Sequence, residues 1–200
     1  MRTPLIALSL YLLLPISTFA QTTETDTTET QVPSVEDQLS FADENGGGPK
    51  VGETYIAAEY GDWALRCLKA AEGEVDACNL YQLLVSDEGA SVAEFNIFQL
   101  PEGGQAVAGA TLVVPLETLL TQQVTISVDG QNARRYPFNF CNRAGCVARI
   151  GFTQPEIDEF KRGIQATVRI VPAAAPTQEV VLAVSLSGFT AGYDNAEGRR

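Results

Sequence analysis

The chain has 200 residues, with 25 acidic against 13 basic side chains, a net charge of −12, and no histidine. This negative charge disfavours nonspecific binding to nucleic acid or to an anionic membrane surface. Without histidine the chain cannot form a Ser-His-Asp triad or a Cys-His pair. The spacing of the acids selects no pair for carboxylate catalysis. We therefore predict no catalytic residue, no cofactor, no metal site and no enzymatic activity.

The first 20 residues are predicted to be a secretory signal peptide. Arg2 gives a basic start, residues 5–14 form an apolar run, and Thr18 and Ala20 supply small side chains three and one positions before a cleavage point. A membrane anchor needs about 20 apolar residues, whereas Pro15 interrupts this run. We expect an exported protein, in the periplasm or beyond the cell, with no transmembrane segment.

Residues 21–54 are predicted to be a disordered acidic tether. This segment holds eight acids against Lys50 alone, and it is rich in threonine and glutamate. With few large apolar residues it cannot bury enough surface to offset the entropy lost on folding. Residues 55–200 are then long enough for one domain with its own core.

Short apolar stretches separated by Gly, Pro, Asn and Asp predict an all-β sandwich or barrel of about nine strands with one short helix. The first strands are expected at residues 62–68, 79–85, 91–99 and 111–114. Because side chains alternate along a strand, Trp63 would share the face that carries Cys67. We expect Trp63 to be a core residue that packs near a disulfide.

The clearest hairpin signal lies at residues 124–128, where apolar and polar side chains alternate before Asp129-Gly130. These two residues supply the positive φ angles that a two-residue turn needs. The chain is expected to return over residues 134–140, and another strand is expected at 147–152.

A capping-box pattern, Thr153 with Glu156, predicts a helix near residues 154–162. Two strands follow, at residues 164–170 and 180–186. The second of these is apolar on both faces, which is typical of a central strand. We therefore predict that it lies in the middle of a sheet.

Four cysteines in an exported chain are expected to form disulfides. Of the three possible pairings we favour Cys67 with Cys78 and Cys141 with Cys146, because each joins segments that should be adjacent across a hairpin or loop. A zinc site is disfavoured by the ten residues between the first pair. A redox centre more often has two residues between its cysteines, and the second pair encloses four.

One segment, residues 131–154, contains four arginines beside aromatic residues and no acid. Such a set could bind an anion or a protein partner. Alternatively, the arginines lie on outer faces and pair with acids elsewhere in the domain. The candidate partner-binding residues are Arg134, Arg135, Tyr136, Arg143 and Arg149.

Several short motifs occur in the order typical of one family. They are Tyr60-Gly61-Asp62-Trp63 leading to Cys67, then Cys78, Val114-Pro115-Leu116, Val128-Asp129-Gly130, Cys141 with Gly145-Cys146, and residues 184–189. From Tyr60 to about Tyr193 the chain resembles the invasion-associated locus B family, although Glu117 stands where that family often has glycine. The resemblance implies a bacterial exported protein with an immunoglobulin-like β-sandwich. Some relatives are linked to entry into host cells, and the family has no established catalytic residues.

We therefore predict an exported, disulfide-bonded, non-enzymatic envelope or secreted protein. It would bind a protein or cell-surface partner. Host interaction is known for some relatives and stays an open possibility for this chain. Two alternatives stay open: a periplasmic enzyme, either a carboxylate-based hydrolase or a thiol-active protein, and a structural envelope protein with no discrete ligand.

Overall fold

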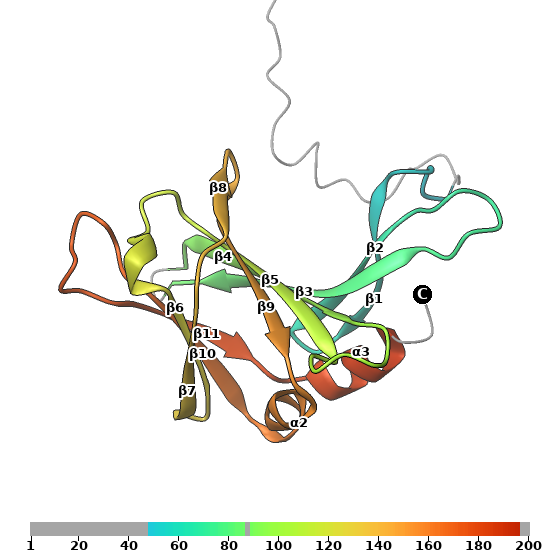
Figure 1. The fold of residues 1–200 in the computed structure, drawn as a ribbon. Helices are drawn as coiled ribbons and strands as arrows, with labels where there is room; N and C mark the ends of the chain where they lie inside the picture. The colour runs from blue at the N-terminus through green and yellow to red at the C-terminus, as the bar shows by residue number, and fades with distance from the viewer. Residues whose placement is uncertain (1–47, 87–88, 197–200) are drawn as a thin grey trace, which may run out of the picture. The chain divides into compact units, whose positions relative to one another are not determined.

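A computed structural model describes residues 48–86 and 89–196 of the chain. Within these residues, eleven strands form two antiparallel sheets, so the predicted all-β sandwich is confirmed (Figure 1). The expected count of about nine strands was too low. The predicted signal peptide and residues 21–47 of the predicted tether lie outside the described residues.

The larger sheet is a five-strand meander extended by one hairpin. In spatial order its strands are β1 (Thr54–Tyr60), β2 (Trp63–Leu68), β3 (Ala77–Val85), β4 (Ser91–Gln99), β5 (Ala108–Val114), β9 (Gly145–Phe152) and β8 (Phe140–Asn142). Strand β1 was missed from the sequence. Its apolar residues do not alternate cleanly, because its pairing with β2 shifts register between Ile56 and Ala58.

The smaller sheet contains β11 (Val180–Ser185), β10 (Gln165–Ile170), β6 (Val124–Val128) and β7 (Gln131–Tyr136), in that order. Both turn residues between β6 and β7 have positive φ, 48° at Asp129 and 71° at Gly130, as the hairpin prediction requires. The returning strand ends at Tyr136, earlier than expected, because Pro137 has no N–H for a ladder.

The prediction that the strand at residues 180–186 is central was wrong. In the structure β11 lies at the edge of the smaller sheet and pairs only with β10. Its inward residues Leu182 and Val184 are fully buried, whereas Val181 on the other face is 50% exposed. Burial within this sheet therefore explains the apolar residues on the inward face of β11 but not the apolar residue on its outward face.

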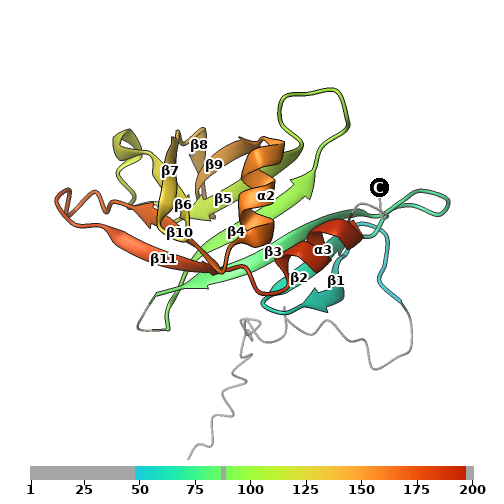
Figure 2. The same ribbon diagram turned by 90° about the horizontal axis from the view of Figure 1, so that it is seen from below.

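Helix α2 (Gln154–Arg162) lies where the capping box predicted it, and the Thr153 N–H donates to the Glu156 carboxylate at 2.7 Å. A second helix, α3 (Phe189–Ala196), was not predicted. It packs against β1 to β4 of the larger sheet and contacts α2. Figure 2 shows α2 beside the smaller sheet and α3 next to β1, β2 and β3 of the larger sheet. A short 3-10 turn, η1 (Leu120–Gln122), precedes β6.

Aromatic rings join the helices to the sheets in one core. Phe189 of α3 packs against Trp63 of β2 at 5.3 Å between ring centroids and against Phe160 of α2 at 5.5 Å. Phe160 in turn packs against Phe152 of β9 at 5.2 Å. Trp63 is buried on the same face as Cys67, as predicted.

Two of the motifs that carry the family resemblance touch each other, although they lie near opposite ends of the domain's amino-acid sequence. Gly61 follows β1 and Gly188 follows β11, and both have positive φ. A Cβ at Gly61 would collide with the Ser187 backbone, and one at Gly188 would collide with the Tyr60 carbonyl. Glycine is therefore required at both positions for the close approach of the two chain segments.

Candidate partner-binding surfaces

Arg134 and Tyr136 point inward from β7 onto helix α2. The Arg134 guanidinium pairs with Glu156 at 3.2 Å and with Glu159 at 3.0 Å. The Tyr136 hydroxyl donates to Glu156 at 3.0 Å. These two predicted residues therefore hold the helix against the smaller sheet, and their polar groups are engaged within the domain.

The same contacts shift the protonation of this cluster. Burial opposes ionisation of Glu156, but hydrogen bonds from Thr153 and Tyr136 and the charge of Arg134 outweigh it, so its pKa lies below the ordinary value. Burial, together with the nearby Glu156 charge, raises the pKa of Tyr136. The folded domain thus favours an ionised Glu156 beside a neutral Tyr136.

A depressed folded pKa means that Glu156 stabilises the fold above its unfolded pKa of about 4.3, and this stabilisation is lost as the pH falls through the folded value. We expect Glu156→Gln to lower the free energy of unfolding by about 1–3 kcal/mol at pH 7 and to flatten the acid limb of the pH profile. Urea unfolding across a pH series measures both effects. Glu72→Gln, at an exposed position, is the control and should leave the pH profile of stability unchanged. If the Glu156 variant lost as much stability in acid as the unsubstituted protein, Glu156 would not be the group responsible.

Arg135 points to the opposite face from its neighbours, because side chains alternate along β7. It lies opposite Thr125 of β6, which lies opposite Arg169 of β10. The outward face of the smaller sheet therefore carries two arginines, Arg135 and Arg169. Sequence reasoning missed Arg169 as a neighbour because it lies 34 residues further along the chain.

The β8–β9 hairpin carries the remaining two predicted residues. Arg143 lies exposed in its turn, and the Arg149 guanidinium lies 5.2 Å from the centroid of the Phe140 ring, which is 42% exposed. Figure 1 shows the β8 end of this hairpin projecting from the domain. We call Phe140, Arg143 and Arg149 the hairpin surface.

The five predicted residues thus do not form one surface. Arg134 and Tyr136 face helix α2, Arg135 lies on the outward face of the smaller sheet, and the other two belong to the hairpin surface. The acids that engage Arg134 and Tyr136 come from α2, outside the acid-free segment. Phe140 joins the surface through its contact with Arg149.

Both predicted disulfides are formed in the structure. Cys67 and Cys78 lie directly opposite each other on β2 and β3, and Cys141 and Cys146 do so on β8 and β9. The second disulfide closes the hairpin at the residue next to Phe140. It therefore limits how far the two strands that carry the hairpin surface can separate.

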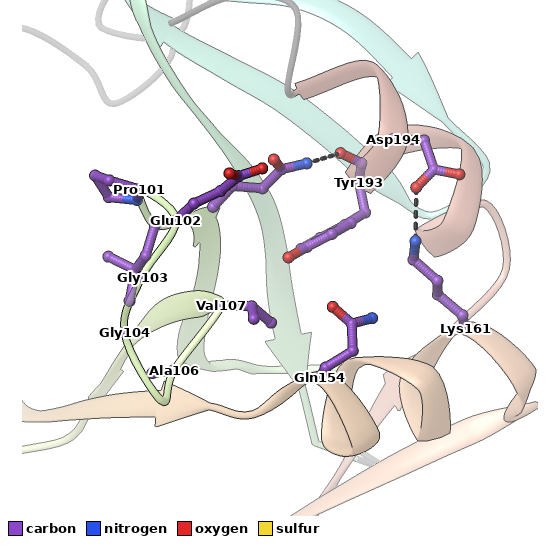
Figure 3. A pocket seen from close by; sticks show the side chains of 12 residues that line it. Pro101, Glu102, Gly103, Gly104, Ala106, Val107, Gln154, Lys161, Tyr193 and Asp194 are labelled. Atoms are coloured by element: carbon purple, nitrogen blue, oxygen red, sulfur yellow. Dashed lines mark hydrogen bonds and ion pairs between the residues drawn. The ribbon is translucent and has the colours of Figure 1, made fainter.

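A pocket of about 320 Å³ lies between the loop after β4 and the two helices (Figure 3). Its polar lining includes Glu102, Gln154, Lys161 and Asp194. Lys161 pairs with Asp194 at 2.7 Å and lies 5.0 Å from the centroid of the Tyr193 ring. A ligand in this pocket would have to share Lys161 with Asp194, and we assign the pocket no reaction.

Neither described helix is long and apolar enough to cross a bilayer. Within residues 48–86 and 89–196, no group of three or more acidic or cysteine side chains is placed to hold a metal ion.

The fold and these surfaces define a class of protein: a disulfide-bonded β-sandwich that presents an Arg- and Phe-bearing hairpin. A family model described as Invasion associated locus B (IalB) protein matches residues 63–197, and the chain belongs to this family. The family is named for its association with invasion, and this name specifies no reaction.

The comparisons also give individual relatives. Two invasion protein B homologs of Brucella abortus, from strain 2308 and from biovar 1 strain 9-941, are each 24% identical to the chain over 152 residues, which is 76% of this chain and 82% of each relative. The crystal structure of invasion associated protein B from Bartonella henselae matches with a TM-score of 0.60 and 24% identity, over 73% of this chain and 95% of that one. This match shows the shared fold.

Proposed function

We propose that this protein is an exported, non-enzymatic module that binds a carboxylate-rich surface of another protein through its hairpin surface. The observation that carries the proposal is a disulfide-closed hairpin with an exposed Phe140 beside Arg149, an exposed Arg143 in its turn, and no acid on β8 or β9. Two disulfides and membership of an invasion-associated family support export, either to the periplasm or to the cell surface.

The chemistry of the hairpin surface suits protein docking. An arginine guanidinium presents several N–H donors in a fixed plane, so it can pair with a carboxylate through two hydrogen bonds. Arginine and aromatic side chains are enriched among the residues that dominate binding energy at interfaces. The Cys141–Cys146 disulfide restricts the hairpin before binding, which reduces the entropy lost when a partner docks.

A partner on a host cell is one form of this proposal, supported by the names of the relatives. The Brucella proteins are called invasion protein B homologs, and the Bartonella protein is called invasion associated protein B. A partner in the bacterial envelope would use the same charge complementarity, and the identity of a captured protein distinguishes the two.

In-cell photo-crosslinking tests this proposal. A photo-reactive residue replaces Ala144, which is exposed in the hairpin turn, and adducts are measured in the living source bacterium and on host cells. We expect Arg143→Glu with Arg149→Glu to reduce a specific adduct at least tenfold, since each charged contact contributes about 1.5–3 kcal/mol.

The matched control is Arg135→Glu with Arg169→Glu, which makes the same change in net charge on the outward face of the smaller sheet. It should leave the adduct intact. All variants should keep the melting temperature close to that of the unsubstituted protein, because these side chains are exposed. Equal loss in both double variants, or an adduct that survives reversal of the hairpin charges, would remove the hairpin surface from the proposal.

A further inference from the structure

The free edge of β11 differs from the other three sheet edges. Strand β1 has a bulge and an exposed Glu59, β8 is only three residues long, and β7 carries two arginines. Charges, bulges and short length are the devices that prevent edge strands from pairing with other chains. Strand β11 reads VVLAVS, with no charge, no proline and no bulge.

The hydrogen bonds of β10 show which backbone groups of β11 face outward. The Gln165 carbonyl accepts from the Asp129 N–H, and the Gln165 N–H donates to the Asp129 carboxylate, so both groups point away from β11. Gln165 lies opposite Ser185, and the register continues without a shift to Ile170 opposite Val180. Because antiparallel ladders alternate, Val181, Ala183 and Ser185 direct their N–H and carbonyl groups to the free edge.

Ser185 is already engaged at that edge. The Ser185 N–H donates to the Gln82 side chain at 2.8 Å, and the Ser185 carbonyl accepts from the Trp63 indole N–H at 2.8 Å. Among the described residues, none hydrogen-bonds to the outward groups of Val181 and Ala183. The open part of the edge is therefore short. It contains the outward backbone groups of Val181 and Ala183, and it stops at Ser185, whose groups are already engaged.

We propose that β11 pairs antiparallel with β11 of a second copy of this chain, about a two-fold axis at Leu182. This register places Val181 opposite Ala183 of the other copy, and the reverse pair follows by symmetry. Each pair exchanges two backbone hydrogen bonds. The two four-stranded sheets then become one continuous sheet.

A second copy fits this edge better than other registers or occupants. Pairing through Ser185 would break its bonds to Gln82 and Trp63. In the register at Leu182, Glu179 comes opposite Ser185 of the other copy, so the hydrogen-bonded pairing extends no further than Val181 and Ala183. The register at Leu182 uses only the two residues whose backbone groups are open, and it is self-complementary, as a two-fold interface requires. It also brings no charged residue of β11 against its copy, although the whole chain has a net charge of −12. The absence of charge and bulge in β11 is then consistent with its place in the dimer.

Charged residues placed at Val181 and Ala183 test whether a second copy of the chain binds the edge and whether it pairs in the register at Leu182. Val181 and Ala183 are exposed, so the fold should accept polar replacements there. In Val181→Lys with Ala183→Lys, lysine faces lysine in both pairs, and like charges directly opposite destabilise a strand pair. In Val181→Lys with Ala183→Glu, lysine faces glutamate in both pairs. Sedimentation over a concentration series should show a dimer for the unsubstituted protein, at least tenfold weaker dimerisation for the first variant, and recovery in the second.

Thr167→Lys on β10 is the matched control, since it adds charge to the same face one strand away from the edge. It should leave dimerisation unchanged. Hydrogen exchange gives an independent readout: the amides of Val181 and Ala183 should be protected only at concentrations where the dimer forms. A monomer throughout the series, or a dimer indifferent to the Lys-Lys variant, would overturn the proposal; protection of these amides only by another polypeptide would instead assign the edge to a heterologous strand.

Discussion

Replacing Phe189 with alanine is expected to lower the free energy of unfolding by about 3–5 kcal/mol. The Phe189 side chain is fully buried, and its ring lies 5.3 Å from Trp63, 5.5 Å from Phe160 and 5.6 Å from Tyr193 between centroids. Truncation would leave a cavity at the point where α3 meets both α2 and the larger sheet. Urea unfolding measures the loss, and the emission of Trp63, the single tryptophan, reports the loosened packing.

Ile164→Ala is the control for this prediction. Ile164 is also a large apolar residue, but it is 84% exposed, so its truncation should change stability by less than about 0.5 kcal/mol. If the Phe189 variant lost no more stability than this control, α3 would not be an integral part of the core. The family match, which extends to residue 197, would then reach beyond the cooperative unit.

The parts of the fold that the sequence predicted have local signals. Asp129-Gly130 adopts the two positive φ angles of a tight turn, and Thr153 with Glu156 begins a helix, because each depends on residues within a few positions. The disulfide pairing was also predictable, since each pair closes a short loop between adjacent strands.

The parts that were missed depend on contacts distant in sequence. Helix α3 has Gly192 in its middle, and it is held by the packing of Phe189 and Tyr193 rather than by a local signal. The edge position of β11 could not be predicted from its composition, because apolar residues on both faces are typical of a buried central strand, whereas Val181 on the outward face of β11 is 50% exposed.

The candidate site shows the same division. Alternation along β7 separates Arg135 from Arg134 and Tyr136 and could have been applied to the sequence. The partners of Arg134, however, are Glu156 and Glu159 of α2, more than 20 residues away. Sequence composition therefore identified an arginine-rich segment, whereas the division into inward contacts and an exposed hairpin surface required the fold.

The second large effect concerns the disulfide between β2 and β3. Replacing Cys67 and Cys78 with alanine is expected to lower the free energy of unfolding by about 3 kcal/mol, because the bond closes a loop in the unfolded chain between cysteines with a sequence separation of 11. The same change at Cys141 and Cys146, whose sequence separation is 5, should cost about 2 kcal/mol. Chemical unfolding without reductant measures both, and reduction of the unsubstituted protein should lower its stability further than either pair alone.

The two disulfides should differ more in binding than in stability. Cys67 and Cys78 lie in the five-strand meander, away from the hairpin surface, whereas Cys141 adjoins Phe140. We expect loss of the Cys141–Cys146 bond to weaken the photo-crosslinked adduct at Ala144 at a temperature where both variants remain folded, because the hairpin then loses its restriction before binding. Loss of the Cys67–Cys78 bond should leave the adduct intact under the same conditions. An adduct that follows global stability, and falls more in the Cys67–Cys78 variant, would indicate that the second disulfide only stabilises the fold.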